Sequence, residues 1–296
     1  MKNYLQDFFK TFAYETRDSE ELLAAYDKII SHKDANTVWD ELMDTYKNDL
    51  HCDVGGTLRK KALDLAPALA LHPYTLDLLL HICLSRQTKE YYKERGLSLD
   101  IWQDSMSDLK YKLVECREVY GICGTFVGSW FNRFFDLTRF ALGRLQYELI
   151  RFEGDYQKNG ITLTPDSLVI NVHIPRTGTR MSEQDCDASF ALAAKHFEKE
   201  LGGAPIVFRC HSWLLFPKHQ TILPPNSNIR KFAARFECLK SGEYADYQEL
   251  WRLFDRNYPG TPDKLPYATT LHRAYVDLIR AGEKTGWGMG IFLYQK

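Results

Sequence analysis

Two histidines on two expected strands carry the clearest chemical signal in this sequence. His173 lies in an apolar run over residues 168–174, and His211 lies in a second run over residues 206–216. A histidine with an ordinary pKa of about 6.5 can take a proton from a nucleophile at neutral pH. If the two runs pair as strands, the two rings could be neighbours. Each histidine could equally be a hydrogen-bonded part of the structure, so both interpretations stay open.

The segment between the two runs could bind an anion. It reads Arg-Thr-Gly-Thr-Arg over residues 176–180 and leads through Met181 to an expected helix. Bare backbone N–H groups and the helix dipole favour phosphate at a helix start, and Gly178 allows a close backbone approach. The candidate binding residues are Arg176, Thr177, Gly178, Thr179, Arg180 and Ser182. Glu183 and Asp185 in the first helical turn would oppose an anion, so a plain connecting loop is the alternative.

Glu148 is a third candidate, because it lies where polar and apolar residues alternate from Arg139 to Phe152. A period of two is typical of a strand, and it places Arg144, Gln146 and Glu148 on one polar face of a long strand. A carboxylate there could act as general base, directly or through water, if partial burial raised its pKa. A structural ion pair with Arg144 or a solvated face is the alternative.

Cys210 stands directly before His211, which raises the alternative of a thiol hydrolase. Successive side chains of a strand point to opposite faces, so these two residues cannot form a nucleophile–base pair with each other. Such an enzyme would need His173 or another histidine to reach Cys210. The residues expected to share a face are Val169, Asn171 and His173 on the first strand, and Arg209, His211 and Trp213 on the second.

The composition is that of a soluble globular protein with a packed core. The 296 residues favour about two domains, with 45% hydrophobic and 26% charged residues. Lys and Arg number 38 against 39 Asp and Glu, for a net charge of −1. This balance gives no electrostatic reason to expect nucleic acid or an anionic membrane as a partner.

The sequence also argues against a targeting segment, a membrane span, a disulfide framework and a metal site. The N-terminus lacks the apolar stretch of a signal peptide, and Asp77 and His81 interrupt the longest apolar run, residues 76–84. The seven cysteines form no Cys-x-x-Cys pair, so no zinc site is expected. We therefore expect a cytoplasmic protein with reduced thiols and no bound metal.

The first 120 residues or so have the pattern of a helical bundle without a catalytic cluster. Asp18 and Glu21 resemble a capping box ahead of an apolar stripe. A later stripe is interrupted at Pro67, and Pro73 stands where a first helical turn tolerates proline.

The second half mixes strands and helices in the manner of an α/β layer domain. Strands are expected over residues 139–152, 168–174, 206–216 and 287–294. Ser182 is expected to cap a helix with Phe190, Ala193, Phe197 and Leu201 as its apolar stripe, which ends at Gly202. Further helices are expected over residues 226–234, 247–254 and 270–281.

Several segments of the second half resemble a bacterial family of acyltransferases with a helical N-acyltransferase-type N-terminal domain and a GNAT-like C-terminal domain. The segments are Gly143-Arg-Leu-Gln-Tyr-Glu148, Val172-His-Ile-Pro175, Cys210-His-Ser-Trp-Leu-Leu215, Leu223-Pro-Pro-Asn-Ser-Asn-Ile229, Leu265-Pro-Tyr-Ala-Thr-Thr-Leu-His-Arg-Ala274 and Gly286-Trp-Gly-Met-Gly290. The resemblance implies an α+β protein. Its helical N-terminal domain would span residues 1–125, and its GNAT-like mixed sheet with flanking helices would span residues 126–296.

The resemblance also implies acyl-CoA or acetyl-CoA as co-substrate. In GNAT proteins two central parallel strands splay apart around the pantetheine, and the loop after the first strand binds the pyrophosphate. The strands at 168–174 and 206–216 match these two in order, and the loop from Arg176 to Ser182 matches in position. This loop departs from the usual Arg/Gln-x-x-Gly-x-Gly/Ala pattern, because it is one residue short and Met181 replaces the second small residue.

The leading hypothesis is an N-acyltransferase that moves an acyl group from acyl-CoA to an amine of a small molecule or peptide by direct attack. His211 or Glu148 would be the base, and His173 a second proton carrier or a positioning group. Backbone N–H groups of the later strand would polarise the thioester carbonyl. The alternative is a catalytically silent GNAT-like module that binds a ligand or protein, with the helical half as an interaction or homodimer surface.

Overall fold

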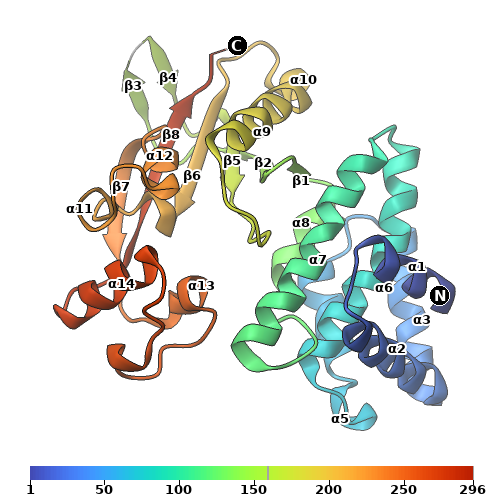
Figure 1. Ribbon diagram of the computed structural model, residues 1–296. Coiled ribbons are helices and arrows are strands. Elements are labelled where there is room, and N and C mark those ends of the chain that lie inside the picture. The colour runs from blue at the N-terminus through green and yellow to red at the C-terminus, as the bar shows by residue number, and fades with distance from the viewer. Residues whose placement is uncertain (159, 296) are drawn as a thin grey trace. The chain divides into compact units, whose positions relative to one another are not determined.

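The computed structural model describes residues 1–158 and 160–295, and the chain divides into two compact units. We call Met1–Phe140 the helical unit and Ala141–Lys296 the sheet unit (Figure 1). The first consists of helices and the second of a mixed sheet with helices, so the fold class expected from the sequence is confirmed.

The helical unit is built around α6 (Pro73–Glu94), which contacts α1, α2, α3, α4, α7, α8 and η2. The run from residue 76 to 84 is buried on every side, which explains why it is apolar apart from Asp77 and His81. The other elements are α1 (Lys2–Thr11), α2 (Thr16–Ser31), α3 (Lys33–Asn48), η1 (Val54–Leu58), α4 (Arg59–Leu63), α5 (Ala66–Leu69), α7 (Leu99–Tyr120), η2 (Gly128–Phe131) and α8 (Asn132–Phe135).

Helix boundaries in this unit agree with two sequence signals and contradict a third. The break before Pro67 and the start of α6 at Pro73 are confirmed. The capping box was wrong, because α2 begins at Thr16 and Asp18 lies inside its first turn. Asp18 and Glu21 instead accept hydrogen bonds from Arg117, at 2.7 and 2.5 Å.

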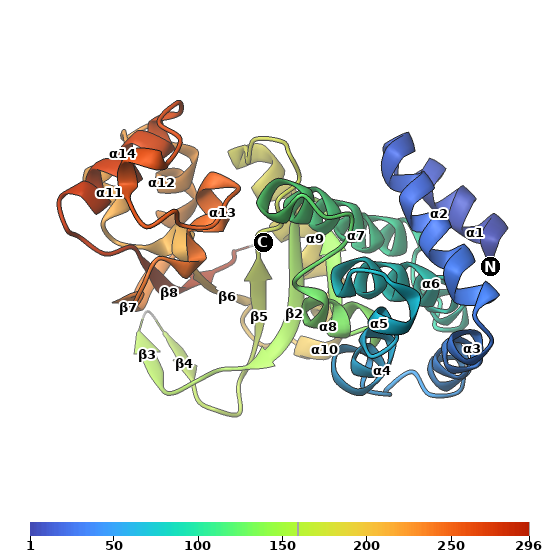
Figure 2. The ribbon, with the colours of Figure 1, turned by 90° about the horizontal axis from the view of Figure 1, so that it is seen from below.

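The sheet unit contains one six-stranded mixed sheet in the order β1-β2-β5-β6-β8-β7. In this sheet β5 and β6 pair in parallel, whereas β2–β5, β6–β8 and β7–β8 pair antiparallel. A separate hairpin, β3–β4, extends from the chain between β2 and β5 (Figure 2). The strands are β1 (Arg139–Leu142), β2 (Leu145–Arg151), β3 (Tyr156–Lys158), β4 (Ile161–Leu163), β5 (Leu168–His173), β6 (Val207–Ser212), β7 (Glu237–Glu243) and β8 (Gly286–Leu293).

Three strand predictions need correction. The single long strand over residues 139–152 was wrong, because Gly143 takes φ +72° and makes a turn between β1 and β2. The strand over residues 206–216 ends at Ser212, whose hydroxyl accepts from the backbone N–H of Leu214 and begins the short helix η3 (Trp213–Leu215). Trp213 therefore does not share a strand face with Arg209. Strand β7 was not predicted at all.

Helix α9 (Glu183–His196) covers one face of the central strands. Ser182 caps it as expected, with its hydroxyl accepting from the N–H of Asp185 at 3.0 Å. Phe190 packs against Tyr147 of β2 and Phe208 of β6. The short helix α10 (Glu198–Leu201) follows, and Gly202 ends it in the left-handed conformation.

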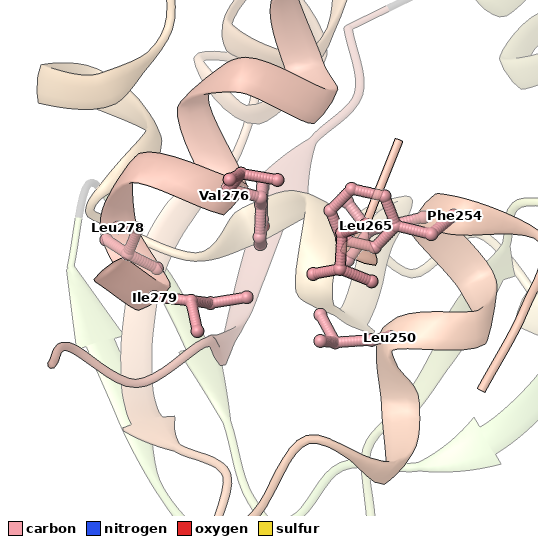
Figure 3. Packing of buried hydrophobic residues seen from close by; sticks show 8 residues of the cluster. Leu250, Phe254, Leu265, Val276, Leu278 and Ile279 are labelled. Carbon is pink, nitrogen blue, oxygen red and sulfur yellow. The ribbon is translucent and has the colours of Figure 1, made fainter. Parts of the chain in front are cut away.

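Residues between Leu250 and Ile279 form an apolar cluster of their own (Figure 3). Leu250 and Phe254 from one segment pack with Val276 and Ile279 from α14 (Thr270–Arg280). The other elements in this part of the chain are α11 (His219–Ile222), α12 (Asn228–Ala233), η4 (Gln248–Leu250), α13 (Trp251–Phe254) and η5 (Pro262–Lys264). This cluster supports Asp255, the residue after α13, which contacts the loop described below.

Candidate functional site

Polar side chains form a row across three neighbouring strands of the sheet unit. Glu148 of β2 lies opposite Asn171 of β5, and Asn171 lies opposite Arg209 of β6. Side chains alternate along each strand, so these three lie on the face opposite to Tyr147 and Phe208, which pack against α9. We call Glu148, Asn171, His173 and Arg209 the polar row.

Hydrogen bonds join the members of the polar row. His173 Nε2 lies 2.7 Å from Glu148 Oε1, and Asn171 Nδ2 donates to the same oxygen at 3.1 Å. Arg209 Nη1 donates to Asn171 Oδ1 at 3.0 Å. The Glu148 side chain is 5% exposed and that of His173 is 19% exposed. The arrangement is a buried carboxylate hydrogen-bonded to a more accessible imidazole, which is the pattern of an oriented general base.

The polar row lies where the pairing of the parallel strands ends. The β5–β6 register runs from Ile170–Phe208 to Val172–Cys210, and β6 then continues against β8 alone. His173 therefore lies one residue beyond the last residue of β5 that pairs with β6. Backbone groups released at such a point are available to a ligand.

His211 lies one residue beyond the pairing on the other strand and has a different environment. Its ring is exposed and meets the ring of Trp287 edge-to-face, with centroids 4.5 Å apart. Although the residue as a whole is exposed, partial desolvation of its ring and the nearby Arg209 charge lower the pKa of His211 below its usual value, which favours the neutral form. The structure thus brings Glu148 and His173 into direct contact and places His211 separately, against β8.

The loop after β5 has internal partners for several of its polar groups. Arg176 forms a two-pronged ion pair with Asp255, at 2.6 and 3.2 Å. The hydroxyls of Thr177 and Thr179 lie 2.9 Å apart, and Gly178 between them takes φ +75°. The glycine is therefore required here, because other residues rarely adopt this conformation.

The end of the loop carries one exposed cation and two satisfied acids. Arg180 is exposed. Glu183 accepts from Lys231 Nζ at 2.6 Å, and Ser182 Oγ lies 2.5 Å from Asp185 Oδ2. The two acidic groups that oppose an anion at this helix start thus have partners of their own.

Cys210 lies in an environment that disfavours a reactive thiolate. Its side chain is fully buried, and burial raises the pKa of its thiol to about 12. It also lies on the opposite face of β6 from His211, as the alternation along the strand requires. A buried thiol that stays protonated is a poor nucleophile, which argues against the hydrolase alternative.

Asn171 and Arg209 are members of the polar row for which no role was predicted from the sequence. Their shared face with the histidines was visible from alternation alone. The strand register places Asn171 opposite both Glu148 and Arg209. This register cannot be predicted from the residues of either strand alone.

Two searches of the described residues gave negative results. No group of three or more His, Cys, Asp or Glu side chains within residues 1–158 and 160–295 is arranged to hold a metal ion. Over the same residues, every helix is too short or too polar to cross a membrane.

Comparison with family models divides the chain in two. Residues 3–137 match the model of an N-acyltransferase N-terminal domain, and residues 139–292, more than half of the chain, match a GNAT-like C-terminal domain. The comparison with curated proteins found no match.

Solved structures with the same fold include acyltransferases with acyl-CoA. One is an acyltransferase mutant in complex with octanoyl-CoA, with a TM-score of 0.78 and 20% identity; the match covers 98% of this chain and 87% of the other. A second is an acyltransferase in complex with decanoyl-CoA and teicoplanin, with a TM-score of 0.76, 19% identity and the same coverage. A third, in complex with CoA and 10C-teicoplanin, has a TM-score of 0.76 and 18% identity, with equal coverage.

Proposed function

Because the chain belongs to the family with a GNAT-like C-terminal domain, we propose that it transfers an acyl group from acyl-CoA to an amine. The observation that carries this proposal is the 2.7 Å contact between Glu148 and His173 at the point where β5 and β6 stop pairing. The family places the thioester in a wedge between two such strands. A base there is within reach of an attacking amine.

The reaction needs a proton acceptor that can later return the proton. His173 takes the proton from the amine nitrogen as that nitrogen attacks the thioester carbon, and Glu148 stabilises the imidazolium that forms. The C–N bond forms, the C–S bond breaks, and the departing CoA sulfur takes the proton. His211, neutral because its pKa is lowered, is the second group that can serve as base or proton carrier.

The loop from Arg176 to Ser182 would hold the pyrophosphate of the co-substrate. Its left-handed Gly178 and the exposed Arg180 fit a phosphate, because a bare backbone and a guanidinium both donate hydrogen bonds. Thr177, Thr179 and Ser182 add hydroxyls, of which Ser182 also caps α9. Arg176 would bind the pyrophosphate only if its guanidinium contacted the phosphate and Asp255 together, or released Asp255.

The acceptor would be a small molecule or peptide with a free amine. Relatives of the same fold are complexed with teicoplanin, so this glycopeptide belongs in an acceptor panel beside simple amines and short peptides. The direct test is calorimetric titration of the full chain with acetyl-, octanoyl- and decanoyl-CoA, followed by measurement of CoA thiol release with each acceptor. Binding of an acyl-CoA, and release that depends on both acceptor and His173, are the expected results. No binding at millimolar co-substrate would refute the proposal.

A second candidate is a silent module that keeps the fold without turnover. The observation in its favour concerns the segment expected to bind phosphate. Its residues Arg176, Ser182 and Glu183 already make hydrogen bonds to other side chains of the protein. Under this alternative, acyl-CoA fails to bind, or binds without any acceptor-dependent release of CoA across the panel.

A further inference from the structure

We propose that Gln146 binds the nitrogen of the acceptor through its side-chain oxygen and so selects primary amines over secondary amines and alcohols. This role of Gln146 rests on the acyl transfer proposed above, and it narrows the class of acceptor. Gln146 belongs to β2, on the same face as Glu148. The feature that assigns it a ligand is a buried amide oxygen without a partner.

Gln146 is a buried polar residue at the candidate site. The residue is 2% exposed, and its Oε1 atom has almost no surface in contact with solvent. Within residues 1–158 and 160–295, no group donates a hydrogen bond to this oxygen. Nearly all buried amide oxygens accept a hydrogen bond, because burial without one costs free energy. An unpaired oxygen beside candidate catalytic groups therefore points to a partner supplied by a ligand.

The strand register places Gln146 beside the candidate base. Gln146 lies directly opposite His173 across β2 and β5, so both side chains leave the same face, with Cβ atoms about 4.5–5.5 Å apart. The polar groups on either side have partners. Glu148 contacts His173 at 2.7 Å, and Arg144 Nη1 donates to the Pro175 carbonyl at 3.0 Å. Between these two contacts, the Gln146 oxygen has no donor.

The order of the strands indicates which reactant supplies the donor. A carbonyl oxygen only accepts, so the ligand must present an N–H or O–H group. The proposed function places the thioester and its pantetheine between β5 and β6, whereas Gln146 lies on β2, on the other side of β5. The acceptor must come within reach of His173, which is directly opposite Gln146. The geometry therefore favours the acceptor nitrogen over the amide groups of the pantetheine.

The number of hydrogens on the attacking atom gives the selectivity. A neutral primary amine carries two hydrogens, of which one passes to the base and the other is donated to Gln146 Oε1. A secondary amine or an alcohol carries only one, and the base takes it. A methyl group in place of the second hydrogen would leave the buried oxygen unpaired. Sites that bind a substrate N–H in this way discriminate strongly against analogues that lack it.

The first test compares two acceptors that differ by one N–H group, benzylamine and N-methylbenzylamine. If the wild type prefers another primary amine of the acceptor panel, that amine and its N-methyl derivative replace them. Gln146→Met keeps the length of the side chain and removes the amide oxygen. Gln157→Met, at an exposed position of β3, is the matched control. Release of CoA thiol from octanoyl-CoA measures the rate.

Gln146→Met should lower kcat/KM for the primary amine at least tenfold. The same variant should lower kcat/KM for the N-methyl amine by no more than about twofold, and the KM for octanoyl-CoA should stay within about twofold of the wild type. A general loss of structure would not produce this difference between two acceptors. The control variant should match the wild type with both amines.

The second test does not depend on activity. Gln146→Met removes an unpaired buried oxygen, so its Tm without ligands should equal or exceed that of the wild type. A Tm well below that of Gln157→Met would show that the oxygen has a structural partner, such as a buried water, and would overturn the proposal.

The kinetic outcomes separate this proposal from the function on which it rests. If the wild type transfers the acyl group and folded Gln146→Met loses nothing, or loses equally with both amines, the role of Gln146 is refuted and acyl transfer stands. If the wild type transfers no acyl group to any acceptor of the panel, the proposed function is refuted and the role of Gln146 with it.

Discussion

Among the described residues, the carboxylate–histidine pairs Asp77–His81 and Glu148–His173 have different surroundings. In the helical unit, Asp77 Oδ1 lies 3.5 Å from His81 Nδ1, and both side chains are 0% exposed. In the sheet unit, Glu148 Oε1 lies 2.7 Å from His173 Nε2, with side-chain exposures of 5% and 19%. Residue types alone do not distinguish a structural pair from a chemical one, whereas access and partners do.

In the helical pair, Asp77 and His81 both make their contacts with other groups of the helical unit. Arg59 binds the Asp77 carboxylate at 2.8 Å, and His81 Nδ1 lies 2.7 Å from the Asp77 carbonyl oxygen, to which it donates. The His81 ring packs against Phe131 and Phe135. Burial lowers the pKa of His81 below its usual value, so this ring resists protonation near neutral pH. We interpret the helical pair as structural and the sheet pair as the candidate base.

The largest expected effect separates the two pairs by activity. His173→Ala should lower the acceptor-dependent rate by about 10²- to 10⁴-fold, the usual contribution of a general base. Thiol release under saturating octanoyl-CoA measures it, and thermal unfolding confirms that the variant is folded.

His211→Ala is the matched control for this experiment. The ring of His211 contacts Trp287 rather than a carboxylate, and we expect a smaller loss of rate than for His173→Ala. A larger loss in His211→Ala than in His173→Ala would transfer the role of base to His211.

The second prediction concerns stability in the helical unit. Asp77→Ala should lower the free energy of unfolding by about 3–5 kcal/mol, because it leaves the partly buried Arg59 without its carboxylate. Urea denaturation followed by circular dichroism measures the change. Asp64→Ala is the control, since Asp64 pairs with Lys60 in the same region but is 62% exposed. An equal loss of unfolding free energy in both variants would show that the buried ion pair stabilises the protein no more than the exposed one.

The unit from β5 through α9 to β6 could be predicted from the sequence because its signals are local. Two apolar runs, a serine cap at Ser182 and a glycine stop at Gly202 each depend on a few adjacent residues. The turn at Gly143 was missed because the alternation of polar and apolar residues was read through it from Arg139 to Phe152, whereas β1 is buried along its whole length. Strand β7 was missed because it is polar, largely exposed and irregular between Cys238 and Lys240.

The candidate site, too, was predicted from the sequence only in part. Alternation along the strands predicted which side chains share a face with His173. It could not predict that Glu148 would meet His173, because that contact depends on the antiparallel register of β2 against β5. The partner of Arg176 was also beyond reach, since Asp255 lies 79 residues further along the chain in a left-handed conformation after α13.

The third prediction uses the pH dependence of the helical pair. The folded pKa of His81 lies below the unfolded value of about 6.5, so the unfolded chain binds the proton more readily. The contribution of a neutral His81 is therefore complete above this pH and is lost as the pH falls below it, by at most about 1.4 kcal/mol per pH unit.

The measurement is the free energy of unfolding from pH 8 to pH 5 in wild type and His81→Gln. The variant should show a shallower decline below pH 6.5. Burial also lowers the pKa of His219, to about 4, so the wild type and the variant share that second contribution and only their difference is informative. Parallel curves would show that His81 does not titrate between the folded and unfolded states in the expected way.

The smallest expected effect concerns the ion pair between Arg176 and Asp255 in the loop after β5. It tests whether Asp255 keeps Arg176 from binding a phosphate. Asp255→Asn removes one charge from the Arg176 ion pair, which is 33% and 42% exposed. If phosphate must compete with Asp255 for Arg176, the variant should bind octanoyl-CoA a few-fold more tightly, and Arg176→Gln a few-fold more weakly, by calorimetry. If the ion pair only supports the loop, both variants should bind more weakly. Asp263→Asn, which removes one of the two carboxylates that pair with Arg280 at a more exposed position, should leave the affinity unchanged. The direction in which Asp255→Asn changes the affinity for octanoyl-CoA therefore decides whether Arg176 can bind the co-substrate or, like Arg59, has a structural role.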